Sequence, residues 1–369
     1  MTAPLQVLLV EPYFSGSHRA WAEGYAASSA HDIRLVTMPA SFWKWRMAGG
    51  FVTLADAVDR SVAERGPIDV VLASSMTNLP ALLGSARRHL AGVPAALYMH
   101  ENQLTYPLSP LDREDLTYAM INWTSMTVAD AVFFNSAFHR SVWFDALPSF
   151  IGRFPDARHT DQVEPVTARS SVLPVGVDLR RFDAVPQTRS EVPLILWNQR
   201  WEHDKGPEDF AAAILELAER GHSFEVALAG ERFAEHPKEF IALMERLGDR
   251  VVQAGFADET RYRQLLRSAD VVVSTAHQEF FGIAITEAVY AGAMPVLPNR
   301  LVYPERIPDE FHDRCLYDSR VGLVDRLEWT MTNRDAAAAV GAALHDTMAA
   351  YDWSLVAPGY DAALLDLVR

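Results

Sequence analysis

The chain has 369 residues, 49% hydrophobic and 10% aromatic, the composition of a globular protein with room for two domains. Its 48 acidic and 33 basic residues give a net charge of −15, which argues against a general nucleic-acid binder because non-specific binding is driven by positive surface. The single cysteine, Cys315, excludes an internal disulfide, and no apolar run reaches the roughly 18 residues needed to span a membrane. The residues after Met1 contain no basic segment of the kind that begins a signal peptide. We therefore expect a cytoplasmic protein.

A local basic groove is compatible with this net charge. The residues that could line one are Arg87, Arg88, His89, Arg140, Arg153, Arg158 and Arg169. Scattered surface arginines would explain the same positions equally well.

Short apolar runs alternate with helical patterns along the first half of the chain. Strands are predicted at 6–10, 32–37, 67–73, 95–99, 131–135 and 171–175, and helices at 19–29, 54–65, 79–91 and 117–129. The apolar run at 6–10 is typical of a strand buried on both faces. This alternation predicts an α/β fold with a doubly wound parallel sheet.

The pattern breaks at 185–192, where prolines and polar residues indicate a linker, and then restarts. Strands are predicted at 194–197, 224–229, 269–274 and 294–297, with helices at 207–219, 236–247, 259–267, 321–332 and 334–350. We therefore expect one Rossmann-like domain at 1–184, a second at 193–352, and a final helix at 353–369.

Neither half carries the glycine fingerprint of a dinucleotide-binding turn, a Walker lysine loop or a zinc-type spacing of Cys and His. NAD use is therefore not expected. In open α/β sheets, ligands bind beyond the carboxyl ends of the strands. Two such sheets facing each other would hold a ligand in the cleft between them.

Two carboxylates, Glu279 and Glu287, flank a glycine that opens a predicted helix. A helix N-terminus suits phosphate because its amides are unpaired and carry partial positive charge. One carboxylate beside the loop and one on the helix could hold sugar hydroxyls on either side of that phosphate. The alternative is two solvated glutamates at an ordinary strand-to-helix turn.

Two cations, Arg200 and Lys205, follow the first strand of the second half. Cations at a strand end can neutralise a diphosphate, and a nucleoside diphosphate leaves only if its developing charge is stabilised. Gly230 and Glu231 follow the next strand and are expected at the same edge of the sheet. The alternative for the cations is a pair of solvated loop residues.

Arg200, Lys205 and the pattern Glu279-x-x-Gly-x-x-x-x-Glu287-Ala resemble the retaining glycosyltransferases of the GT-B fold, of the glycosyltransferase 4 type. The resemblance implies two Rossmann-like domains whose parallel sheets face each other across a cleft, with the last helix packed on the first domain. It also implies that Arg200 and Lys205 bind the donor diphosphate, Glu279 the donor sugar and Glu287 the ribose. The remaining donor-binding positions would be Gly16, Ser17, Gly230, Glu231, Phe281, Gly282 and Ile283. Such enzymes generally need no metal, and no DxD-like triad is present.

The first half is similar to a narrower family. Its strings are Glu11-Pro-Tyr-Phe-Ser-Gly-Ser-His18, Trp43-Lys-Trp-Arg46 and His100-Glu-Asn-Gln-Leu-Thr-Tyr-Pro107. Over nearly the whole chain they resemble the tRNA-queuosine alpha-mannosyltransferase family. Membership implies that mannose is transferred from GDP-mannose to queuosine in the anticodon of tRNA-Asp, with the α-configuration retained. The long polar insertion of the animal proteins is replaced here by a short linker.

The residues of these first-half strings could form the acceptor-binding side of the site. Trp43 and Trp45 would face the same way in an extended loop, where bases could stack on both rings, and Arg46 could pair with a phosphate. Asn102 and Gln103 are expected to contact the acceptor as well. The alternative is that both tryptophans pack in the core.

His100 follows a buried strand and should point into the cleft, where the resemblance gives it a place beside the donor sugar. Gly16 and Ser17 could approach the phosphate because glycine lacks a Cβ, and His18 could lie near the acceptor. A structural histidine at 100 and a helix N-cap at Ser17 are the alternatives.

With no carboxylate nucleophile evident, we expect a front-side substitution in which the departing diphosphate oxygen takes the acceptor's proton, with His100, Arg200, Lys205 and Glu279 as the catalytic residues. A retaining GT-B enzyme that uses another nucleotide sugar and a small-molecule, lipid or glycan acceptor is the first alternative. A nucleotide-sugar binding protein without catalysis is the second.

Overall fold

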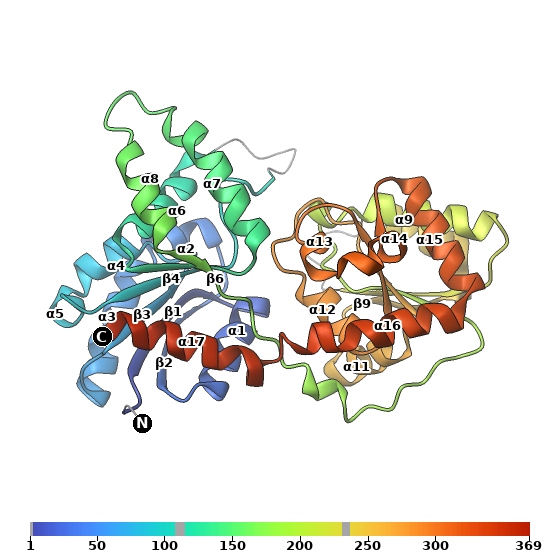
Figure 1. Cartoon of the computed structure of the whole chain (residues 1–369), viewed down its shortest axis with the longest axis horizontal. Coiled ribbons are helices and arrows are strands. Elements are labelled where there is room, and N and C mark those ends of the chain that lie inside the picture. The colour runs from blue at the N-terminus through green and yellow to red at the C-terminus, as the bar shows by residue number, and fades with distance from the viewer. Residues whose placement is uncertain (1–2, 108–114, 231–236) are drawn as a thin grey trace. The chain divides into compact units, whose positions relative to one another are not determined.

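The computed structural model describes residues 3–107, 115–230 and 237–369, which divide into two compact units. The first unit comprises Met1–Val177 together with Trp353–Arg369, and the second is Asp178–Asp352. Each unit is built on one parallel sheet with helices on both sides (Figure 1). The doubly wound α/β architecture expected from the alternating pattern is therefore confirmed.

The first unit has a six-stranded sheet in the order β2-β1-β3-β4-β5-β6. The strands are β1 (Gln6–Phe14), β2 (Asp32–Pro39), β3 (Val70–Ser74), β4 (Ala95–Met99), β5 (Ala131–Phe134) and β6 (Ser170–Val172). The helices are α1 (Gly16–Ser28), α2 (Trp43–Gly49), α3 (Phe51–Arg65), α4 (Leu79–Ser85), α5 (Arg87–Leu90), α6 (Leu116–Val128), α7 (Ala137–Ile151), α8 (Thr160–Ala168) and α17 (Trp353–Val368). Val7 to Val10 of β1 are fully buried, as expected for a central strand covered on both faces.

The second unit has a six-stranded sheet in the order β12-β11-β10-β7-β8-β9. The strands are β7 (Leu194–Trp197), β8 (Glu225–Ala229), β9 (Val251–Gly255), β10 (Val271–Val273), β11 (Met294–Pro298) and β12 (Leu316–Tyr317). The α-helices are α9 (Pro207–Glu219), α10 (Lys238–Leu247), α11 (Glu259–Ser268), α12 (Ile283–Tyr290), α13 (Tyr303–Arg306), α14 (His312–Cys315), α15 (Arg320–Thr332) and α16 (Arg334–Ala349). Two short 3₁₀ helices, η1 (Arg180–Phe182) and η2 (His203–Lys205), precede and follow β7.

Three helices of the first unit, α2, α7 and α8, were not expected from the sequence. The α7 and α8 segments contain Pro148 and Pro165, which argue against a helix because proline lacks the amide donor. A local cap starts α7, since the Ser136 hydroxyl accepts a hydrogen bond from the His139 amide at 3.0 Å. Burial of Trp143, Leu147 and Phe150 then outweighs the proline.

The boundary between the units lies at Val177, earlier than the expected linker at 185–192. The segment before β7 is bonded into the second unit: the Leu179 amide donates to Asp352 at 3.2 Å, and the Tyr290 hydroxyl donates to Asp183 at 2.9 Å. Arg189, inside the expected linker, donates to the carbonyl of Gly292. Prolines and polar residues indicate irregular backbone, but they do not show what that backbone is bonded to.

The final helix, α17, belongs to the first unit. Trp21 Nε1 donates to the Tyr360 hydroxyl at 3.1 Å, and the Tyr25 hydroxyl donates to Asp361 at 2.8 Å. Trp353 lies so close to Gly24 that a Cβ there would be 2.0 Å from its indole. Among the described residues, no helix is both long and apolar enough to cross a bilayer.

Candidate active site

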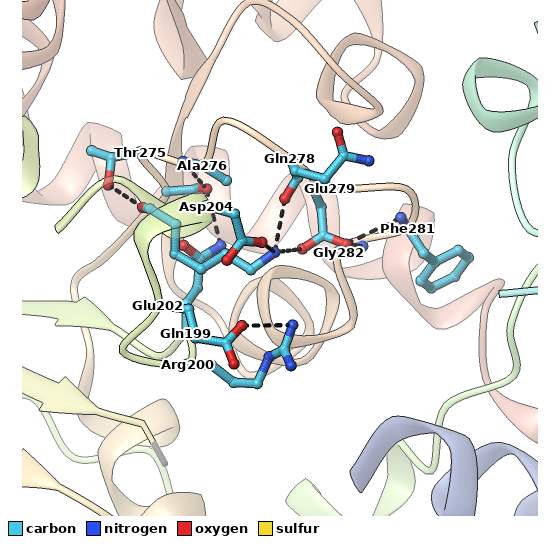
Figure 2. A network of polar contacts seen from close by, with 12 residues as sticks. Gln199, Arg200, Glu202, Asp204, Thr275, Ala276, Gln278, Glu279, Phe281 and Gly282 are labelled. Atoms are coloured by element: carbon cyan, nitrogen blue, oxygen red, sulfur yellow. Dashed lines mark hydrogen bonds and ion pairs between the residues drawn. The ribbon is translucent and has the colours of Figure 1, made fainter. Parts of the chain in front are cut away.

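Lys205 is the centre of a polar network in the second unit, and Figure 2 shows its partners Asp204, Gln278 and Glu279. Its Nζ lies 2.8 Å from the Gln278 carbonyl oxygen, 3.2 Å from Asp204 Oδ2 and 3.4 Å from Glu279 Oε2. Burial would lower the pKa of Lys205, but the carboxylates of Glu279 and Asp204 outweigh it and raise the pKa above its usual value. Lys205 is therefore a buried, protonated ammonium, and the interpretation of it as a solvated loop cation is wrong.

Arg200 has a different environment from Lys205. Its side chain is 48% exposed, and its Nη2 lies 3.1 Å from Glu202 Oε2. Burial raises the pKa of Glu202, while the charge of Arg200 opposes that shift. The network thus combines a fixed internal cation with one that remains accessible to a ligand.

Glu279 connects Lys205 to the start of α12. Its Oε1 accepts hydrogen bonds from the amides of Phe281 and Gly282 at 3.3 and 3.0 Å (Figure 2). Gly282 has φ +86°, a left-handed conformation that glycine adopts without steric cost. The positive end of the α12 dipole therefore lies at this loop, as expected for phosphate binding.

Arg306 contacts the same loop, and its role was not predicted from the sequence. It is 4% exposed, its Nε donates to the Phe281 carbonyl at 3.1 Å, and its guanidinium lies 4.1 Å from the centre of the Phe281 ring. A second ring, Tyr351, has its centre 4.7 Å from the guanidinium, and its hydroxyl accepts a hydrogen bond from Nη1. Arg306 thus determines where the backbone before Gly282 lies.

Glu287 is buried on α12, so it is not a solvated glutamate. Its Oε1 lies 2.5 Å from Arg181 Nη2, and its Oε2 accepts from the Tyr262 hydroxyl at 2.7 Å. Burial raises the pKa of Glu287, and both partners oppose that shift. Because each oxygen is already engaged, a ribose hydroxyl would have to share an oxygen with Arg181 or Tyr262.

Gly230 follows β8 where the chain passes very close to the end of β7. A Cβ on Gly230 would lie 2.0 Å from the Gln199 carbonyl oxygen, so no side chain fits. Ile283 opens α12 beside this edge of the sheet. Glu231, also expected in the donor site, lies outside the described residues.

The first unit brings together Glu11 of β1, His18 of α1 and His100, which directly follows β4. Glu11 is fully buried; its Oε1 accepts from the Tyr13 amide at 2.8 Å and its Oε2 lies 2.9 Å from His18 Nδ1. The rings of His18 and His100 have centres 4.5 Å apart. Glu11 was not anticipated as a site residue, although it begins the string that ends at His18.

His100 is held as a neutral imidazole. Burial, with smaller contributions from His18 and His139, lowers the pKa of His100 well below its usual value. Its Nε2 is buried without a hydrogen-bond partner in the described part of the chain. The ligand atoms of Glu11, His18 and His100 all lie within 4.8 Å of one another, a two-histidine, one-glutamate set of the kind that can hold zinc.

Gly16 is the first residue of α1 and has φ +50°. A Cβ there would meet nothing within 4 Å, so its conformation, not space, favours glycine. The interpretation of Ser17 as an N-cap is wrong, because Ser15 occupies that position and Ser17 lies inside the helix. Gly16 and Ser17 are both exposed.

Trp43 and Trp45 are on helix α2, not in an extended loop. Residues two apart on a helix point in nearly opposite directions, so the expectation that both rings face one way is wrong. Trp43 packs against Tyr118, with ring centres 5.0 Å apart, whereas Trp45 is 63% exposed. Arg46 donates to the Pro39 carbonyl and to Ser41, within its own loop.

Asn102 and Gln103 form part of the turn after β4. Asn102 is buried, and its Oδ1 accepts from the amides of Leu104 and Thr105 at 3.0 and 2.8 Å. The Gln103 amide donates to Asn122, and its side chain donates to Glu101. These bonds explain both residues as turn-forming groups, and a role in acceptor binding stays a prediction.

Three of the arginines considered for a basic groove donate hydrogen bonds to the backbone. Arg140 donates to the Thr167 carbonyl at 3.0 Å, and Arg169 donates to the carbonyls of Met126 and Thr127 at 3.1 and 2.9 Å. Arg158 likewise donates to the Phe154 carbonyl. These guanidinium groups are therefore engaged in hydrogen bonds to backbone carbonyl oxygens.

Comparison with known proteins connects the two units to one family. Residues 6–177 match a family model described as tRNA-queuosine alpha-mannosyltransferase N-terminal, and residues 180–344 match glycosyl transferases group 1. The tRNA-queuosine alpha-mannosyltransferase of Drosophila melanogaster is 33% identical over 331 residues, which cover 87% of this chain and 85% of the fly protein. The chain belongs to the tRNA-queuosine alpha-mannosyltransferase family. It is therefore a glycosyltransferase.

Solved structures of other proteins have the same fold as this chain. Sucrose-phosphate synthase from Thermosynechococcus elongatus superimposes with a TM-score of 0.73 at 15% identity, covering 98% of this chain and 99% of the other. HepE from Anabaena, in complex with UDP and glucose, gives 0.68 at 15% identity with the same coverage. The GT-B fold expected from the resemblance is confirmed.

Proposed function

We propose that the protein transfers mannose from GDP-mannose to queuosine in the anticodon of tRNA-Asp and retains the α-configuration. The observation that carries a nucleotide-sugar donor is the contact of 3.4 Å between Lys205 Nζ and Glu279 Oε2 at the start of α12. It combines a buried cation, a carboxylate and a helix N-terminus, which suit a diphosphate and a sugar together. Family membership supports mannose and queuosine.

The chemistry follows from these groups. The bond between the sugar and the diphosphate breaks, the acceptor oxygen bonds to the sugar, and the acceptor's proton passes to the departing diphosphate oxygen. Lys205 and Arg200 stabilise the charge that develops there. Glu279 holds the sugar's hydroxyls while its Oε1 holds the loop before α12. His100 is proposed as a further catalytic residue, because its neutral imidazole can donate or accept a hydrogen bond.

Two cations at the diphosphate supply the charge that a divalent metal supplies in other transferases. We therefore expect transfer to continue in EDTA, with GDP-mannose as the co-substrate. Glu287, oriented by Arg181 and Tyr262, would contact the ribose. A tRNA acceptor also favours a cytoplasmic location.

Incubation with radiolabelled GDP-mannose and queuosine-containing tRNA-Asp tests the proposal. We expect label on that tRNA, and none on the same transcript with guanosine in place of queuosine. UDP-glucose is the matched control for the donor. Label that appears only with UDP-glucose, or only on the unmodified transcript, would contradict the proposal.

One observation favours a second candidate, a small-molecule, lipid or glycan acceptor. The net charge is −15, and Arg140 and Arg169 are used by backbone carbonyls, which leaves fewer cations for an anticodon arm. Label in a metabolite or lipid extract, with none on tRNA, would establish this alternative.

A further inference from the structure

We propose that Phe42 and Trp45 form a stacking platform for unpaired bases of the RNA acceptor. This inference rests on the proposed tRNA acceptor and replaces the expected pair, Trp43 and Trp45. Phe42 is 82% exposed and Trp45 63% exposed, and both lie at the start of α2. Phe42 precedes the first residue of α2, and its carbonyl oxygen accepts the Trp45 amide at 2.8 Å, so the two exposed residues belong to the same turn of the backbone.

The backbone holds Phe42 outward in an unfavourable conformation. Phe42 has φ +47° and ψ 60°, the left-handed region, which is rare for a bulky residue and is found mainly at functional sites. Its carbonyl oxygen accepts from the amides of Trp45 and Arg46 at 2.8 and 3.1 Å. The conformation is therefore maintained by the first turn of α2, and the ring gains no burial from it.

Trp45 is oriented by a glycine one turn later. A Cβ on Gly49 would lie 3.0 to 3.2 Å from three carbons of the Trp45 indole. The ring thus lies along the helix over Gly49 and leaves its other face open. A fixed aromatic ring loses little conformational freedom when a base stacks on it.

Trp43 anchors the platform to the rest of the unit. It packs with Tyr118 against the small cluster of Met47, Met76 and Ile121. Arg46 ties the loop before α2 through bonds to Pro39 and Ser41. These contacts explain why the neighbouring aromatic residues in this string have different roles.

The positive charge beside the rings favours RNA as the ligand. Lys44 is exposed between the aromatic residues in the sequence, with its Nζ 5.5 Å from the centre of the Trp43 ring. Aromatic rings interleaved with cations are the combination that binds single-stranded nucleic acid, because bases stack on the rings while cations contact phosphates. This local arrangement is compatible with an acidic protein overall.

The test measures the Kd for a fluorescent queuosine-containing anticodon stem-loop in F42A, W45A and the conservative variant W45F. We expect Kd to rise about fivefold to hundredfold for each alanine variant, and W45F to restore most of the loss because it keeps a π face. L355A removes another exposed apolar side chain of the same unit and should leave Kd unchanged. An unchanged Kd in W45A and F42A, or an equal loss in L355A, would overturn the platform.

A second measurement separates this proposal from the proposed function. GDP-mannose hydrolysis without acceptor reports donor chemistry, and the control L355A should hydrolyse GDP-mannose at the wild-type rate. G49A, which displaces the indole, should raise the Kd for the stem-loop by less than W45A does. If the wild type binds the stem-loop through these rings but adds no mannose to it, the proposed function fails and the platform stands; if it adds mannose and the ring variants bind normally, only the platform fails.

Discussion

Glu11 Oε2 lies 2.9 Å from His18 Nδ1, and the Glu11 side chain is completely buried. A carboxylate oxygen accepts hydrogen bonds, so Nδ1 of His18 is assigned as the donor in this contact. The second oxygen of Glu11 is held by the Tyr13 amide, which fixes the carboxylate plane. Glu11 therefore sets both the tautomer and the orientation of His18.

The variant E11Q tests this positioning role. An amide can present its NH₂ group to His18, so the tautomer is no longer fixed, and we expect kcat to fall roughly tenfold to a hundredfold, the loss of one charged hydrogen bond. KM for the donor should change little. A double-mutant cycle with H18N is the control: an equal cost of E11Q in both backgrounds would show that Glu11 does not act through His18.

Replacing Lys205 with methionine keeps most of the side-chain volume and removes the ammonium. We expect kcat to fall by about 10²–10³, the usual cost of removing one group that stabilises a developing anion. Circular dichroism should show an intact fold. A variant that retains wild-type turnover would exclude Lys205 from the reaction.

The raised pKa of Lys205 also gives a pH prediction. Because its folded-state pKa lies above the unfolded value, its contribution to stability is complete below about pH 10.4 and is lost as pH rises through the folded pKa. We therefore expect no alkaline limb from Lys205 in kcat below about pH 10. An activity loss near pH 8 that K205R abolishes would contradict this.

The pair formed by Arg181 and Glu287 should reveal the cost of an unpaired buried charge. R181M leaves the carboxylate with Tyr262 alone, and we expect the free energy of unfolding to fall by about 3–5 kcal/mol. The double variant R181M/E287L removes both charges and should recover much of that loss. Urea unfolding of the wild type, R181M and R181M/E287L measures these free energies. A double variant less stable than R181M would refute the explanation. E287Q should raise KM for the donor more than it lowers kcat.

Acid should destabilise the first unit through His139 as well as His100. Burial lowers the pKa of His139 to about 3, and that of His100 well below its usual value. The unfolded chain binds these protons near pH 6.5, so stability is constant above that pH and falls below it by up to about 1.4 kcal/mol per pH unit for each histidine. Urea unfolding at pH 7, 6 and 5 measures the slope. H139Q should reduce it, and an unchanged slope would show that His139 does not contribute.

Much of the fold was predictable from local pattern. Buried strands such as β4 and β7 appear as short apolar runs, and α9 begins at a glycine followed by proline. The helices α7 and α8 were missed because proline is locally unfavourable and only packing compensates for it. Of the candidate site, Lys205, Glu279 and Glu287 were predicted because their types and spacing suit a nucleotide sugar. Arg181 and Arg306 were not predicted, because neither lies in a segment that directly follows a strand, where ligand-binding residues are expected.

The sequence by itself determined the alternation of strands and helices in two α/β units and the residues that begin α12, because apolar runs and helix-start signals are local patterns. Only the tertiary structure decided which charged groups are paired: Lys205 with Glu279, Glu287 with Arg181, and Glu11 with His18. It also decided that Trp43 is packed while Phe42 and Trp45 are exposed. Pairing and burial depend on segments far apart in the chain, and no local pattern records which of them meet.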